Sequence, residues 1–152
     1  MKISLKWLKE LIDTKLSNED LVSKLTDLGL ECSDSQIGPS FSGVVTGKVV
    51  SIAKHANSDH LSICKVNIGN DTMLNIVCGA PNVKNDIYVP VAVVGASLDN
   101  GSFIIKSTKI RGEKSEGMIC SEKELGLSDN NEGIMILNQT PSLGIPFDDF
   151  LE

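Results

Sequence analysis

The sequence predicts an α+β fold in which two short helices precede a small antiparallel β-barrel or sandwich. Apolar residues recur with a period close to 3.6 up to Gly29, and the period changes to 2 after the break at Gly38-Pro39-Ser40. Beyond that break, five strand candidates fall within roughly seventy residues and are joined by turns rather than by helices. Short strands joined in this way are typical of sandwiches and closed barrels.

Two amphipathic helices are expected near the N-terminus. Ser4 is placed to cap the first, and Ser17 to cap the second, because serine is a preferred N-cap residue. Asp20 favours the positive end of the second helix dipole, the stretch 21–28 supplies an apolar stripe, and Gly29 is placed to end the helix in a left-handed conformation. Both helices are too short to be stable alone, so they must pack against other parts of the protein.

The strand candidates alternate apolar and polar residues or are rich in β-branched residues. They cover residues 44–52, 61–68, 73–78, 87–94 and 103–110, with 133–137 as a further candidate. Gly47 inside the first of them indicates a bulge or a tight bend. Ser121 and Glu124 have the spacing of a capping box, which predicts a helix of one or two turns ending at Gly126. The apolar residues of the stretch 141–151 are expected to pack against something.

Charge is distributed unevenly along the chain. The 14 basic and 20 acidic residues give a net charge of -6, but residues 40–118 have a balance of +2, against -2 for residues 1–39 and -6 for residues 119–152. Only the middle segment can therefore present a positive face to a polyanion. No apolar run approaches the roughly 20 residues of a membrane span. The four cysteines are widely spaced with no C-x-x-C pair, which indicates reduced thiols and a cytoplasmic location.

Two clusters suggest chemistry but lack the remaining groups that it needs. The two histidines of the stretch 55–60 flank Asp59, yet no second ligand cluster follows, so a loop between strands is the better interpretation than a metal site. Cys78 ends an apolar strand, where a cysteine behaves as a small hydrophobic residue. The sequence contains no nucleophile elbow, glycine-rich phosphate loop or dinucleotide fingerprint. No catalytic residue, metal or cofactor is expected in this chain.

Four cations fall within nine positions at Lys106, Lys109, Arg111 and Lys114, and Arg111 is the only arginine of the chain. On a strand, Lys109 and Arg111 would share one face and Lys106 would point to the other. Three further lysines join this surface if the strands are neighbours: Lys48, Lys54 and Lys65. A barrel with a cationic face can hold a nucleic-acid backbone, whereas a solvated strand edge that uses lysine against aggregation explains the same residues.

Two longer motifs carry a resemblance to a known family. The stretches 76–83 (IVCGAPNV) and 110–127 (IRGEKSEGMICSEKELGL) resemble the tRNA-binding OB-fold family. Within it, they are most similar to the N-terminal part of the β chains of bacterial phenylalanyl-tRNA synthetases, which the opening stretch 1–8 (MKISLKWL) also resembles. The resemblance covers essentially the whole chain.

The resemblance implies a domain arrangement. Residues 1–39 would be the first part of a small α/β domain, residues 40–137 a five-stranded OB-fold barrel inserted into it, and residues 138–152 a truncated return segment to the first domain. In this family aminoacylation takes place on the α chain and editing lies further along the β chain. ATP and Mg²⁺ are thus implied for the parent enzyme only, and the implied partners are a phenylalanine-specific tRNA and the α chain of an α2β2 assembly, with no DNA and no membrane.

The resemblance also implies RNA-contacting residues. The family's loop motif reads His-Pro-Asn-Ala-Asp followed by Lys or Arg, whereas this chain has Ala56 for the proline and His60 for the final cation. The segment 109–118 matches more closely. The residues expected to contact RNA, by point charges along the backbone rather than by base reading, are Lys48, Lys54, His55, Asn57, Lys65, Lys106, Lys109, Arg111, Lys114, Ser115, Gly117 and Met118.

Three functions follow from these observations. The first is a non-catalytic tRNA-binding module of a phenylalanine–tRNA ligase β chain. The second is a structural or assembly element of the synthetase with little RNA binding of its own, which the net acidity favours. The third is a stand-alone tRNA-binding protein, which Trp7 and its neighbours disfavour because stand-alone members of the family begin differently.

Overall fold

The computed structural model describes residues 3, 5–33 and 41–151. The chain divides into two compact units, Met1–Ile37 and Gly38–Glu152. The predicted cap at Ser4 and the break at 38–40 lie outside the described residues. None of the helices in the described part of the chain is long and apolar enough to cross a membrane.

The first unit contains both predicted helices. They are α1 (Leu5–Leu11) and α2 (Asn18–Asp27). Ser17 caps α2 as predicted, because its Oγ accepts a hydrogen bond from the backbone N–H of Asp20 at 3.1 Å. Gly29 follows the helix with φ +89°, the left-handed conformation that glycine adopts without a Cβ penalty. The predicted apolar stripe is only partly correct, since Leu21 is buried whereas Leu28 is exposed.

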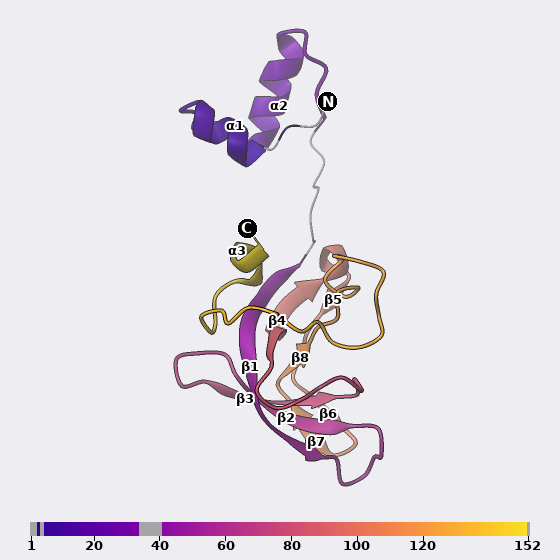
Figure 1. Cartoon of the computed structure of the whole chain (residues 1–152). Coiled ribbons are helices and arrows are strands. Elements are labelled where there is room, and N and C mark those ends of the chain that lie inside the picture. Colours follow the sequence, from indigo (N-terminus) through magenta and orange to yellow (C-terminus); the bar gives the residue numbers. More distant parts are fainter. Residues whose placement is uncertain (1–2, 4, 34–40, 152) are drawn as a thin grey trace. The chain divides into compact units, whose positions relative to one another are not determined.

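The second unit is a curled antiparallel sheet consistent with an OB-like barrel (Figure 1). Its strand order is β3-β2-β1-β4-β5, in which β5 is Phe103–Ile104, and β8 (Gly117–Ile119) also pairs with β4. The four long strands were all predicted, within a few residues at each end. They are β1 (Ser42–Lys54), β2 (Ser62–Asn67), β3 (Met73–Cys78) and β4 (Tyr88–Leu98).

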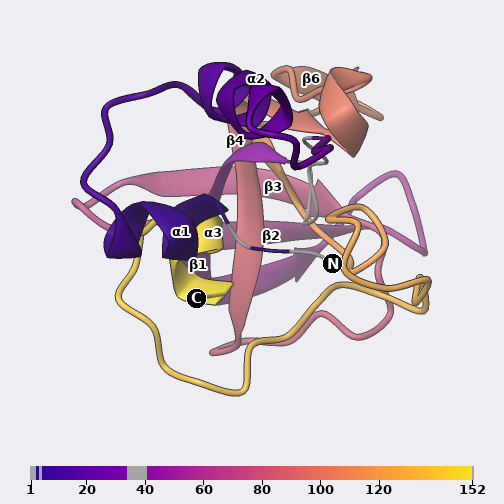
Figure 2. The same cartoon turned by 90° about the horizontal axis from the view of Figure 1, so that it is seen from above.

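The curl arises in β1, which pairs with two strands in succession. Its first half pairs with β4 and its second half with β2, and Lys48 lies at the crossover, opposite both Tyr88 and Asn67. The register to β2 shifts between Val49 and Ser51, and such an irregularity increases the local twist. In Figure 2, β4 accordingly runs across the direction of β2 and β3.

Gly47 lies within an unbroken register to β4, so of the bulge and the tight bend that the sequence indicated, the bulge is wrong. The adjacent strands leave no room for a side chain at this position, because a Cβ would lie 2.7 Å from the Cγ2 of Val91. Glycine therefore permits close packing inside the barrel.

The predicted fifth strand, 103–110, is divided into two short pieces. Its first piece, β5 (Phe103–Ile104), pairs with β4, and Ile105 then turns into the core with its N–H donating to the carbonyl of Ala96. Its second piece, β6 (Thr108–Ile110), leaves this sheet and pairs with β7 (Glu113–Ser115) in a hairpin. Ile105 still accepts from the N–H of Gly95 in β4, so the first pairing ends after this residue, and a single strand over 103–110 is wrong.

Four further segments follow the hairpin. The strand β8 (Gly117–Ile119) pairs with β4. The capping box at 121–124 forms its hydrogen bonds in a turn, so the helix predicted to end at Gly126 is wrong. The candidate strand 133–137 is reduced to an isolated bridge between Leu137 and Tyr88. A short helix that the sequence did not predict, α3 (Phe147–Leu151), ends the described chain.

Hydrogen bonds between β3 and residues 115–116, at the end of β7, connect the two open edges of the curled sheet. The N–H of Val77 donates to Ser115 Oγ at 3.1 Å, and the N–H of Glu116 donates to the carbonyl of Asn75 at 2.8 Å. Inside, nine buried residues form the barrel core, namely Val49, Cys64, Val66, Ile76, Cys78, Val89, Val91, Ile119 and Ile134.

A second core lies between the sheet and the final segment of the chain. Phe147 is fully buried there, with Phe41 and Phe150 around it. The segment is fixed to β1 at Thr46, whose Oγ donates to the carbonyl of Ser142 at 2.6 Å and whose N–H donates to the carbonyl of Ile145 at 3.0 Å. The apolar residues of the tail therefore pack within the second unit.

Candidate nucleic-acid interface

The cationic segment forms the hairpin β6–β7, which turns through two residues. Both turn residues are left-handed, Arg111 with φ +49° and Gly112 with φ +94°, as a type I′ turn requires. The expectation that Arg111 shares a strand face with Lys109 is therefore wrong, because Arg111 lies at the tip of the turn. A left-handed arginine is uncommon, and such backbone positions cluster at functional sites.

Two lysines lie directly opposite each other on this hairpin. Lys109 pairs with Lys114, one step from the turn, where side chains of facing residues are close. Facing like charges destabilise a sheet unless a counter-charge is near. Glu116 supplies one, since its Oε1 lies 2.6 Å from Lys114 Nζ, and this lysine lowers the pKa of the Glu116 carboxyl. Lys109 and Arg111 have no acidic partner among the described residues.

The loop between β1 and β2 is attached to the turn of this hairpin. Asn57 and Arg111 exchange two hydrogen bonds: Asn57 Nδ2 donates to the Arg111 carbonyl at 3.4 Å, and Arg111 Nη1 donates to the Asn57 carbonyl at 3.2 Å. The two sequence motifs that were considered separately, 55–60 and 109–118, are thus brought together at one end of the barrel. In OB folds, loops of this kind contribute to nucleic-acid binding.

His55 serves this junction from a buried position. It is 3% exposed, its Nδ1 accepts a hydrogen bond from the Asn57 N–H at 3.0 Å, and its Nε2 lies 3.1 Å from the carbonyl of Ile110. Because Nδ1 accepts, the hydrogen must be on Nε2, which donates to that carbonyl. Both ring nitrogens are therefore engaged inside the protein.

The SxGM portion of the motif also makes internal contacts. Ser115 is 3% exposed, and its Oγ donates to the carbonyl of Gly117 at 3.0 Å besides accepting from β3. Gly117 permits close approach of β8 to β4, since a Cβ there would lie 2.8 Å from the Ala92 carbonyl. Met118 is half-buried and lines a pocket that is described below.

The other lysines of the expected site differ in their surroundings. Lys48 forms an ion pair with Asp86 at 3.0 Å and lies over the ring of Tyr88, and the hydrogen bond to that carboxylate raises the lysine pKa. Lys54 is exposed where β1 leads into the 55–60 loop. Lys65 is exposed on β2, and Lys106 is exposed just before the hairpin.

No group of three or more histidine, cysteine or acidic residues that could hold a metal ion is found in 3, 5–33 and 41–151. The cysteines are free thiols. Burial raises the pKa of Cys120 to about 12, whereas a hydrogen bond from the Cys64 thiol lowers the pKa of Cys78 to about 7.

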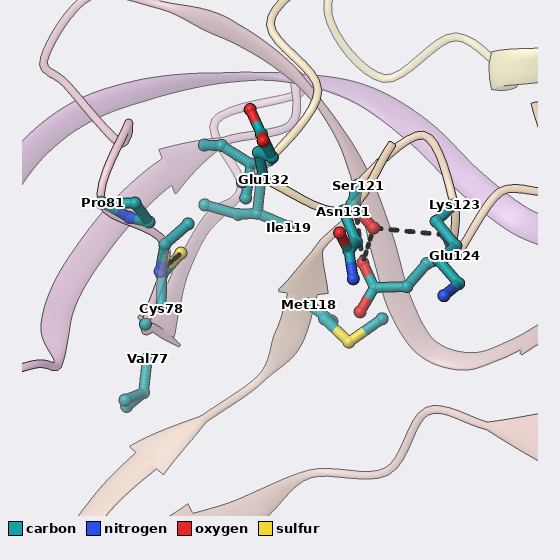
Figure 3. Close-up of a pocket in the computed structure, with 14 residues that line it drawn as sticks. Val77, Cys78, Pro81, Met118, Ile119, Ser121, Lys123, Glu124, Asn131 and Glu132 are labelled. Atoms are coloured by element: carbon teal, nitrogen blue, oxygen red, sulfur yellow. Dashed lines mark hydrogen bonds between the residues drawn. The ribbon is translucent and has the colours of Figure 1, made fainter. Parts of the chain in front are cut away.

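Sequence reasoning did not detect the pocket beside the hairpin. Its cavity volume is about 730 Å³, and it is lined by the end of β3, the loop after it, the end of β8, the capping turn and residues 131–134 (Figure 3). Both motifs that resemble the tRNA-binding family, 76–83 and 110–127, contribute to this wall. The resemblance of these two stretches to the family was the available signal, but no residue type in them indicated a cavity.

A curled antiparallel sheet with a cationic hairpin beside its first loop defines a nucleic-acid-binding module of the OB type. Residues 44–146 match the family described as "Putative tRNA binding domain", and the chain belongs to this family.

Several similar proteins carry one name. "Phenylalanine--tRNA ligase beta subunit" of Trichormus variabilis is 52% identical over 140 residues, which cover 91% of this chain and 17% of that protein. The protein of the same name from Syntrophus aciditrophicus is 44% identical over 153 residues, covering 100% of this chain and 19% of that one. The chain thus spans less than a fifth of the length of these relatives. Among solved structures, the C-terminal domain of Plasmodium vivax p43 superposes with a TM-score of 0.48 at 24% identity, over 68% of this chain and 57% of that one.

Proposed function

We propose that this chain is the N-terminal tRNA-binding part of a phenylalanine–tRNA ligase β subunit and that it contacts the tRNA backbone without taking part in catalysis. The observation that carries the proposal is the hairpin tip, where Lys109 faces Lys114 and Arg111 adopts a left-handed conformation. Glu116 neutralises Lys114 only, so a bound phosphate would supply the counter-charge that Lys109 and Arg111 do not find among the described residues. Lysine and a single arginine act here as point charges, which position a backbone rather than read bases.

The wider setting belongs to the same proposal. The relatives' name supports a partner α chain, which we place in an α2β2 assembly in the cytoplasm, with ATP and Mg²⁺ used elsewhere in the parent enzyme. Residues 1–39 would begin an α/β domain into which the barrel of residues 40–137 is inserted, with residues 138–152 leading back to it. The tRNA would be the one specific for phenylalanine.

His55 acts in this proposal as a positioning residue for the hairpin tip. Its hydrogen bonds hold the 55–60 loop to Ile110, and Asn57 continues the connection to Arg111. Ser115 similarly fixes β7 to β3. Direct RNA contact is then left to the exposed members of the set, which are Lys54, Asn57, Lys65, Lys106, Lys109, Arg111 and Lys114.

The double variant Lys109→Ala/Arg111→Asn tests the proposed function. Asparagine is favoured in left-handed turn positions, so the hairpin should remain folded while two positive charges are lost. Each phosphate contact contributes about 0.7 to 0.9 to the slope of log K against log salt, so we expect the slope for tRNA binding to fall by about 1.4 to 1.8. Fluorescence anisotropy of labelled tRNA at several salt concentrations measures it.

The matched control is Lys15→Ala/Lys24→Ala, which removes the same charge from exposed positions in the first unit. It should leave the slope nearly unchanged. An equal decrease in both variants would show that only net charge matters, and an unchanged slope in the hairpin variant would contradict the proposal.

A role in assembly is the second candidate, and the net charge of -6 of residues 119–152 favours it because this acidity repels RNA. The same hairpin variant in a full-length subunit separates the two functions. A tRNA-binding module predicts a raised KM for tRNA with an intact α–β complex. An assembly element predicts an unchanged KM, since the exposed hairpin charges would have no part in it.

Replacing His55 by alanine is expected to lower the free energy of unfolding by about 1–3 kcal/mol, because the Ile110 carbonyl and the Asn57 N–H lose a buried partner. Urea denaturation measures this change. Hydrogen exchange at the Asn57 amide should also accelerate. His60→Ala is the control, since this exposed imidazole should change stability by less than about 0.5 kcal/mol; equal losses in both variants would contradict the positioning role.

A further inference from the structure

The pocket beside the hairpin is built from parts that specific hydrogen bonds hold in place. Asn82 connects its two sides, because its Nδ2 donates to the Ile134 carbonyl at 2.8 Å and its Oδ1 accepts from the Ile134 N–H at 3.0 Å. On the capping turn, Glu124 Oε2 accepts from the N–H of Ser121 at 2.7 Å and from its Oγ at 2.8 Å. The cavity is therefore a fixed feature of the fold.

The lining of the pocket combines apolar side chains with hydrogen-bonding groups. Pro81, Met118, Ile119 and Ile134 supply the apolar part, and Figure 3 shows Met118 close to the carboxylate of Glu124, with Cys78 and Pro81 across the cavity. The two hydrogen bonds from Ser121 use Oε2, so Oε1 of Glu124 is the acceptor left for an occupant. Such a lining suits a planar group that carries N–H donors.

Charge excludes a phosphate as the occupant. Glu124 and Glu132 line the pocket with Lys123 as the only cation of the lining, so its net charge is negative. A phosphate would be repelled, whereas a neutral nucleobase would not. Protein recognition of RNA commonly takes up unstacked bases against apolar side chains and hydrogen-bonds their edges.

The pocket lies within reach of the RNA backbone that the hairpin would hold. Met118 lies four positions after Lys114, a span of at most about 14 Å in extended chain. That distance corresponds to about four stacked nucleotides at 3.4 Å each. Val77, which lines the pocket, also donates its N–H to Ser115 at the end of β7. A strand that follows the cationic tip can thus place a base in this cavity.

We propose that this pocket takes up one unstacked base of the bound tRNA, and that guanine fits it best. The inference rests on the proposed function, since the hairpin supplies the backbone contact. Guanine presents two adjacent donors, N1–H and the N2 amino group, which can both reach Oε1 of Glu124, whereas uracil presents only one. The hairpin then contributes salt-dependent affinity and the pocket contributes affinity that depends on the base.

Methionine methyl signals test the pocket directly. In the whole chain labelled with ¹³C-methyl methionine, GMP at millimolar concentration is expected to shift the Met118 methyl signal, and UMP is expected to shift it less. Met73 is the internal control, because it is exposed at the start of β3 and does not line the pocket. If GMP leaves Met118 unshifted, or if an arginine amide shifts it and GMP does not, the pocket binds no base and the inference is overturned.

The variant Glu124→Gln links the pocket to tRNA. Glutamine also serves in a capping box, so the turn should persist while the carboxylate is lost. We expect the affinity for tRNA to decrease about fivefold or more, while the slope of log K against log salt stays unchanged. The hairpin variant, in contrast, is expected to lower that slope. Unchanged affinity would overturn the pocket while leaving the proposed function intact. Absence of salt-dependent tRNA binding in the unmodified chain would overturn the proposed function, and the GMP titration would still decide the pocket.

Discussion

Replacing Phe147 by alanine is expected to lower the free energy of unfolding of the second unit by about 3–5 kcal/mol, the range for fully buried aromatic residues. Phe147 is 0% exposed, and its ring centroid lies 5.9 Å from that of Phe41 and 5.6 Å from that of Phe150. The substitution removes these ring contacts and leaves a cavity between β1 and α3. Urea denaturation followed by far-ultraviolet circular dichroism measures the loss.

The helix α3 amplifies this effect because it has five residues and cannot be stable in isolation. Its attachment depends on Phe147 and on the bonds around Thr46, so hydrogen exchange of the Ile145 amide should accelerate together with the loss of stability. Phe103→Ala is the matched control, since the same side chain is half exposed on β5 and should cost about 0.5 kcal/mol or less. Equal losses at both positions would show that the tail is not part of the core.

Local patterns predicted those parts of the fold whose causes are local. The period of apolar residues located α1, α2 and the first four strands, and the Ser17 cap and the Ser121–Glu124 capping box form the expected hydrogen bonds. The stretch 103–110 also reads as a single strand, and Ile105 still bonds to β4, but Thr108–Ile110 pairs with Glu113–Ser115 instead. The alternation of residues within 103–110 does not contain this change of partner.

The turn at Arg111 was not predicted because its sequence is only half of the usual turn signal. A type I′ turn is normally signalled by Asn-Gly or Asp-Gly, and this chain has the glycine but places an arginine before it. The sequence therefore indicated a continuous strand. Arg111 stands where a type I′ turn prefers asparagine or aspartate, so a role in binding explains this arginine better than a role in folding does.

The candidate site was predicted as a set of residue types and not as an arrangement. The cations of the hairpin were evident from the sequence, whereas the roles of His55 and Ser115 depend on contacts with Ile110 and Val77, which are distant in the chain. His55 and Ser115 are buried and support the interface, whereas the cations of the hairpin are exposed and supply its charge.

Replacing Gly133 by alanine is expected to lower the free energy of unfolding by about 2–5 kcal/mol. This glycine has φ +151°, a conformation essentially restricted to glycine, and a Cβ there would overlap the side-chain amide of Asn82. Since Asn82 holds Ile134 by two hydrogen bonds, relief of the overlap would break the connection across the pocket. The variant should therefore also abolish the Met118 shift on addition of GMP.

Gly126→Ala is the control that measures only the cost of placing alanine at a positive φ. Its φ is +68° and no atom lies within 4 Å of the added Cβ, so it should cost only about 1–2 kcal/mol. A double-mutant cycle with Asn82→Ala isolates the contact, because the cost of Gly133→Ala should decrease once the amide is absent. Equal costs in both backgrounds would mean that Asn82 does not meet residue 133, and the wall of the pocket would then depend on other contacts.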